Sequence, residues 1–135
     1  MQIDSATSLT AGIVLLTVAT IAFGGTFLLR VVTGKQPANA LQTSFFRAGH
    51  AHAGVLVILG LLVQLFVDLA DVGDAARGLS LLILVAAIAM PAGFFLSVIG
   101  RDPQRPNPLV ALIWVGAACL VTGVISAGVG LIAAA

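Results

Sequence analysis

Four long apolar segments separated by short polar stretches account for almost the whole chain. They cover residues 9–33, 45–69, 76–100 and 108–134, and each exceeds the roughly 20 apolar residues that cross a bilayer. The polar stretches between them hold about a dozen residues at most, which leaves no room for a separate soluble domain. The pattern predicts an all-α integral membrane protein, with residues 1–135 forming a single four-transmembrane-helix bundle in the lipid bilayer.

The composition supports this fold class and narrows the possible partners. With 60% apolar and 8% charged residues, and a mean hydropathy of +1.18, a soluble domain of this size would expose too much apolar surface. The N-terminal residues include Asp4 and no basic segment, so we expect the first apolar segment to be a retained helix, not a cleaved signal peptide. There is no basic patch with interleaved aromatic residues, so nucleic acid is not an expected partner.

The basic residues are distributed unevenly along the chain. Five of the six flank the first and third polar stretches, and only Arg77 lies in the second; the five are Arg30, Lys35, Arg47, Arg101 and Arg105. Because Lys and Arg collect in cytoplasmic loops, we expect the first and third loops in the cytoplasm and both termini outside. The protein is then a multi-pass protein of the cell (inner) membrane.

Two histidines stand at the start of the second apolar segment, in the sequence Ser44 to Gly60. Successive helical residues turn by about 100°, so His50 and His52 face opposite sides of the helix and are not expected to hold one metal together. His52 shares its face with Ala48 and Gly49, whose small side chains leave room for a second helix or for a porphyrin. Two hypotheses therefore stay open: the histidines pack against neighbouring helices, or one of them is a ligand.

Other polar residues within or beside the apolar segments have simpler interpretations. Gln64 is expected to make a hydrogen bond to another helix. Asp68, Asp71 and Asp74, spaced by three, are expected to form a solvated acidic rim, with a weak calcium site as the alternative.

Turn and helix-breaking residues give two local predictions. Thr43 or Ser44 is expected to cap the second helix by accepting a hydrogen bond from a free amide. Pro91, at the centre of the third segment, removes a backbone donor and is expected to kink the helix there.

Small residues are frequent in the first and last segments. Gly24 and Gly25 allow close approach of another element, and Ser126 with Gly130 forms a small-xxx-small pair suited to association within the bundle or between subunits. Together with the alanine-rich last segment, these residues predict a homo-oligomer.

The order of these parts resembles the styrene oxide isomerase and hydroxylaminobenzene mutase group of small bacterial membrane proteins. The matching residues are Ala51-His52-Ala53-Gly54, Ala76-Arg77-x-Leu79, Gly93-Phe94-Phe95-Leu96 and the Pro-Asn of the third loop. The resemblance implies four spans, a homotrimer and a haem b whose iron is bound by His52. The haem propionates would then pair with cations at the basic edge, where the candidates are Arg47, Arg101 and Arg105.

Three departures from the family pattern bear on activity. Ile58 stands where the family has an asparagine, Phe95 where the isomerases have a tyrosine, and His50 where they have an arginine. Both polar groups thought to hold the substrate's oxygen are thus missing, and the catalytic residues are not identified.

Three functions remain open. The first is a redox-neutral isomerase, in which haem iron acts as a Lewis acid on the epoxide or N–O bond of a small hydrophobic substrate. The second is a non-enzymatic haem protein for gas binding or electron transfer, with His52 and a neighbouring subunit's His50 as ligands. The third is a haem-free small membrane subunit.

Overall fold

A computed structural model describes residues 3–135, and the regular secondary structure of these residues is entirely helical. The elements are α1 (Ser5–Val32), α2 (Ala40–Leu69), α3 (Asp74–Ser80), α4 (Leu82–Leu96), the 3₁₀ turn η1 (Pro108–Val110) and α5 (Ala111–Ala133). The helices α3 and α4 follow each other as one span, so the described chain has four spans long and apolar enough to cross a membrane. The predicted all-α, four-span fold is confirmed, and the chain is a multi-pass membrane protein.

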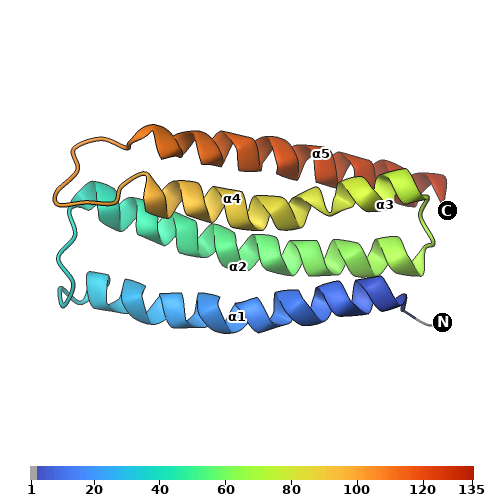
Figure 1. Cartoon of the computed structure of the whole chain (residues 1–135), viewed down its shortest axis with the longest axis horizontal. Helices are drawn as coiled ribbons and strands as arrows, with labels where there is room; N and C mark the ends of the chain where they lie inside the picture. The colour runs from blue at the N-terminus through green and yellow to red at the C-terminus, as the bar shows by residue number, and fades with distance from the viewer. Residues whose placement is uncertain (1–2) are drawn as a thin grey trace.

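The four spans alternate in direction, which separates the charges into two ends. The loops α1–α2 and α4–α5 lie at one end, and the α2–α3 turn lies at the other end with the start of α1 and the end of α5 (Figure 1). We call the first the basic end, defined by Arg30, Lys35, Arg47, Arg101 and Arg105. We call the second the acidic end, defined by Asp4, Asp68, Asp71 and Asp74.

The spans form an open row and not a closed ring. Helix α1 packs on α2 alone among the described elements, α2 packs on α4, and α4 packs on α5. Figure 1 shows the same order, with α1 at one edge of the molecule and α5 at the other. As a result no residue in the apolar window of α1 is buried, although parts of α2 and α4 are.

Glycines spaced by seven along α5 let it approach the third span closely. A Cβ added at any of them would lie under 3.0 Å from a facing side chain. The facing residues are Met90 for Gly116, Ile83 for Gly123 and, for Gly130, Ala76 of α3 together with Val72 of the α2–α3 turn. Such small residues allow tight van der Waals packing where the hydrophobic effect gives no preference for helix contact over lipid. Gly130, whose place within or between subunits was left open, therefore packs within the chain.

The second helix begins earlier than the sequence indicated. Its first residue is Ala40, and its cap is Asn39, whose side chain accepts a hydrogen bond from Gln42 N at 2.8 Å. The Gln42 side chain in turn accepts one from Asn39 N at 3.1 Å, which completes a capping box. The expected cap at Thr43 or Ser44 is wrong because both residues already lie inside the helix, and the cap is formed by Asn39 together with Gln42.

The third span is interrupted at Leu81, and α4 continues through Pro91 as helix. Ser80 Oγ donates a hydrogen bond of 2.7 Å to Arg77 O, and Leu81 N bonds Gly78 O instead of Arg77 O. A serine hydroxyl that takes a backbone acceptor in this way loosens a helix. The break in the helix thus falls ten residues before Pro91, and the kink expected at the proline stays a prediction.

Two polar residues of α2 are held by the third span. Gln64 Nε2 donates a buried hydrogen bond of 2.9 Å to Ser80 Oγ, so the predicted interhelical bond is confirmed. Asp68 accepts hydrogen bonds from Arg77 Nη1 at 2.7 Å, from Asp4 N at 3.0 Å and from Thr7 Oγ1 at 3.2 Å. Its side chain is only 5% exposed, so Asp68 does not belong to a solvated rim as predicted; it ties α1, α2 and α3 together.

Candidate functional site

His52 lies on α2, half-buried beside the aromatic ring of Phe94 from α4. The two ring centroids are 5.0 Å apart, with the planes tilted by 36°. His52 Nδ1 lies 2.8 Å from the carbonyl oxygen of Ala48, one turn earlier in the same helix. A carbonyl oxygen only accepts, so Nδ1 carries a hydrogen, and in the neutral imidazole the lone pair is then on Nε2. This is the tautomer in which Nε2 serves as a metal ligand.

The space expected beside His52, next to Ala48 and Gly49, is partly filled. A Cβ added at Gly49 would lie 2.9 Å from the Phe95 ring and 3.0 Å from Phe94 Cβ, so both phenylalanines occupy the gap that the glycine leaves. The expectation that Gly49 gives a porphyrin room is wrong, because the third span enters that gap. Gly54, where an added Cβ would meet nothing within 4 Å, lies two residues after His52 and so faces the opposite side of α2, the side of His50.

His50 faces a different helix from His52. Its ring lies against the glycine pair of α1, where an added Cβ would be 3.8 Å from His50 at Gly24 and 3.5 Å at Gly25. It takes part in none of the side-chain hydrogen bonds found among residues 3–135. The predicted opposite orientation of the two histidines is confirmed, since one contacts α1 and the other α4.

The donor set around His52 suits a cofactor that brings most of its own ligands. The described residues contain no group of three or more His, Cys, Asp or Glu side chains that could hold a metal ion. A bare zinc ion takes three or four protein ligands, whereas haem iron needs one axial histidine because the porphyrin supplies four nitrogens. His52 offers one imidazole nitrogen, which is the number of protein ligands that a five-coordinate haem iron takes.

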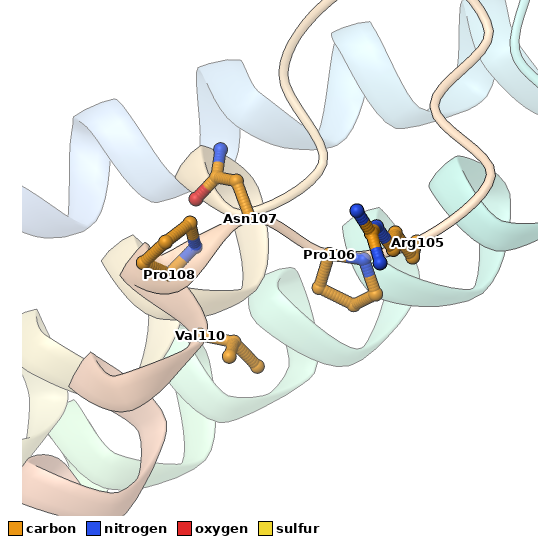
Figure 2. Close-up of a pocket in the computed structure, with 5 residues that line it drawn as sticks. All are labelled: Arg105, Pro106, Asn107, Pro108 and Val110. Carbon is orange, nitrogen blue, oxygen red and sulfur yellow. The ribbon is translucent and has the colours of Figure 1, made fainter.

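The candidate propionate partners are exposed at the basic end. Arg47, Arg101 and Arg105 are exposed, and the ion pairs found in residues 3–135 involve Arg77 at the opposite end. Arg105 lines an open hollow of about 530 Å³ with the residues that lead into α5. Figure 2 shows Arg105 and Pro106 on one side of this hollow and Asn107 and Pro108 on the other.

The loop that carries Arg101 and Arg105 is fixed by the start of α2. Asn39 Nδ2 donates to Asp102 Oδ1 at 2.9 Å and to Pro103 O at 2.8 Å. Gln42 Nε2 donates to Val98 O and Gly100 O, each at 3.1 Å. The same two side chains that cap α2 thus hold the α4–α5 loop. The Asn-x-x-Gln spacing could have indicated the cap, but not these contacts with a distant loop.

Two of the three positions that depart from the family pattern, Ile58 and Phe95, offer no polar group beside His52. Ile58 is 68% exposed on the outside of α2. Phe95 packs against Phe46 with ring centroids 5.6 Å apart and against Gly49. Sequence reasoning missed Phe94 as the neighbour of His52, because the contact joins two helices and no spacing within one segment indicates it.

In comparisons with known proteins, no family model, no curated protein and no solved structure matches the chain. The resemblance to the isomerases rests on the residues quoted above.

Proposed function

We propose that the chain is a membrane haem b protein with His52 as the axial ligand of the iron. The observation that carries this proposal is the hydrogen bond from His52 Nδ1 to Ala48 O. This bond fixes the orientation of the ring and, in the neutral imidazole, leaves the lone pair of Nε2 available to a metal. When bound, a ferric haem supplies a Lewis acid that polarises an epoxide or N–O bond without net redox change.

Several residues of the chain would orient the cofactor. Ala48 and Phe94 fix the plane of the His52 ring, and the arginines of the basic end are the nearest class of counter-ion for two propionates. Of these, Arg47 lies on α2 itself, and Arg101 and Arg105 lie on the loop held by Asn39 and Gln42.

The absorbance spectrum of the purified protein is the first test. We expect a Soret band at about one haem per chain in protein expressed with sufficient haem, with a shift on reduction. The ferric protein is then given an aryl epoxide or an arylhydroxylamine, and rearranged product is measured. A spectrum without a Soret band under these conditions would contradict the proposal and support the third function, a haem-free membrane subunit.

A second candidate function is haem binding without catalysis, for gas binding or electron transfer. It is favoured by the lack of a polar group at Ile58 and Phe95, since Ile58 faces outward and Phe95 packs in the core. A haem-loaded protein that rearranges neither substrate but binds carbon monoxide in its ferrous state would support this function over the isomerase.

The membrane arrangement belongs to the same proposal. The basic end faces the cytoplasm of the inner membrane, because five of the six Lys and Arg residues lie there. The protein is a homo-oligomer, for which the resemblance suggests a trimer. Gly24, Gly25 and Gly130 no longer support this, since they contact His50 and Val72 within the chain; the support is the unburied helix α1 at the edge of the row.

A further inference from the structure

A groove runs between the first helix and the rest of the molecule. It has a volume of about 300 Å³ and is lined by α1 between residues 13 and 21, by Ala53 and Val57 of α2, and by α4 between residues 84 and 88. It forms because α1 packs on α2 but not on α4, so a wedge stays open between α1 and α4. Its volume is at the lower end of the roughly 300–1,000 Å³ range of small-molecule sites.

The lining of the groove is almost entirely aliphatic. Only Thr17 and Thr20 add polar atoms, and both hydroxyls donate to carbonyls of their own helix, Val14 O and Thr17 O, each at 2.6 Å. Their protons are therefore already engaged. Ala53 and Ala87 contribute small side chains, which give the groove its depth. Such a lining favours an apolar body over a charged or strongly polar one.

One end of the groove leads to His50. On α2, His50 precedes Ala53 by one turn, and on α1 the glycine pair follows Thr20 and Ile21 by one turn. Both helices thus reach, one turn further on, the contact between His50 and Gly24–Gly25. A hydrogen-bonding imidazole therefore stands at the basic end of an otherwise apolar groove.

The packing around His50 is loose compared with other glycine contacts. A Cβ at Gly25 would lie 3.5 Å from the ring, in ordinary contact, whereas one at Gly60 or Gly116 would lie 2.3 Å from a facing side chain. The glycine pair therefore leaves space beside a ring that takes part in none of the hydrogen bonds among residues 3–135. A hydrogen bond from a bound molecule would offset the cost of holding that polar ring in an apolar setting.

We propose that this groove binds a small apolar molecule with one hydrogen-bonding group, such as a primary alcohol or a phenol. The apolar body lies among α1, α2 and α4, and the hydroxyl bonds to His50. The site is separate from the proposed haem site, since His50 and His52 contact different helices. It does not depend on haem binding, and its test does not use the cofactor.

The test is photolabelling of the full chain in lipid nanodiscs with 3-azioctanol, an eight-carbon alcohol that carries a diazirine. Mass spectrometry locates the label. We expect it on α1 within residues 13–21 or on α4 within residues 84–88, with labelling that saturates and that octanol displaces. Ala53→Phe, which fills the groove, abolishes the labelling. The matched control is Ala51→Phe, the same change on the exposed side of α2, and it leaves the labelling unchanged.

The contribution of His50 is measured separately. We expect His50→Leu to weaken displacement by octanol by about 2- to 10-fold, the effect of losing one hydrogen bond. Each variant is compared with the wild type by its elution profile. Three results would overturn the proposal: label spread evenly over the outward surface, equal labelling of Ala53→Phe and Ala51→Phe, or octane displacing the probe as well as octanol does. The last would assign the groove to bilayer acyl chains.

Discussion

At the residue scale, the two histidines show what a helical wheel can and cannot predict. The turn of about 100° per residue correctly predicts that His50 and His52 meet different neighbours. It could not predict that Phe94 and Phe95 fill the gap beside Gly49, because the atoms that enter a glycine's space come from another helix. The hydrogen bond to Ala48, which selects the His52 tautomer, joins residues four apart and is available to any helical histidine at this spacing.

The ion-pair centre at the acidic end gives the first prediction. Asp68 accepts bonds from Asp4, Thr7 and Arg77 while nearly buried, whereas Asp71 is fully exposed and lies 3.5 Å from the same arginine. Asp68→Asn removes the charge that Arg77 and the start of α1 share, because a neutral amide cannot balance the guanidinium. We expect it to lower the Tm in detergent by several degrees, and Asp71→Asn to leave it nearly unchanged.

Protease cleavage near the start of α1 gives a second measurement of the same centre. Asp68→Asn is expected to accelerate it, since two of the three bonds to Asp68 come from that segment. Equal Tm values for the two variants would show that Asp68 does not hold the spans together.

At the element scale, span positions could be predicted and their mutual packing could not. A membrane span is recognised by length and hydropathy, which are properties of a single segment. Which side of it is buried depends on neighbours, and the bilayer accepts the same residues as the core does. Ile83 is fully buried and Ile88 is 74% exposed in one helix, α4, although nothing in their type distinguishes them. The order of the helices in the row was therefore beyond sequence reasoning.

The predicted boundaries of the helices were inaccurate for local reasons. The cap of α2 lies in a polar turn several residues before the apolar run, so hydropathy placed the helix start too late. The break at Leu81 accompanies a hydrogen bond from Ser80 Oγ to Arg77 O, and the sequence alone does not show whether a serine forms such a bond.

The glycines of α5 give a prediction with an internal control. A Cβ at Gly123 would lie 2.8 Å from Ile83 Cγ1 and 3.0 Å from Ile83 N, whereas one at Gly128 would meet nothing within 4 Å. Overpacking costs about 1–3 kcal/mol, against roughly 1 kcal/mol gained from the helix propensity of alanine. We expect Gly123→Ala to lower the Tm and Gly128→Ala to keep or raise it. The reverse order would show that α5 does not pack on the third span through this face.

At the scale of the whole molecule, the separation of charges and the open row of spans lead to predictions of membrane orientation and subunit number. The basic end carries five cations and the acidic end carries four of the five carboxylates of the chain. The alternation of the spans places these groups together (Figure 1). The sequence could predict this separation because the charges of the loops can be counted without knowing how the helices pack.

The orientation in the membrane is tested by reporter fusions. A reporter active only in the cytoplasm is expected to work after Gln36, in the first loop, and to be silent after Ala75, at the acidic end. Activity after Ala75 with silence after Gln36 would reverse the orientation.

The subunit number is tested by the mass of the protein in mild detergent. We expect more than one chain, and three if the resemblance holds, because α1 leaves an apolar side without a partner in the described chain. A monomeric mass with the haem still bound would contradict this prediction.

The haem content of two histidine variants tests the central proposal most directly. His52→Ala and His50→Ala are expressed under haem-replete conditions, checked for folding by their elution profiles and compared by haem per chain. We expect His52→Ala to lose the haem and its Soret band, because the free Nε2 is removed, and His50→Ala to keep both, because that ring contacts α1. Full haem in His52→Ala together with loss in His50→Ala, or a wild type without haem, would contradict the account.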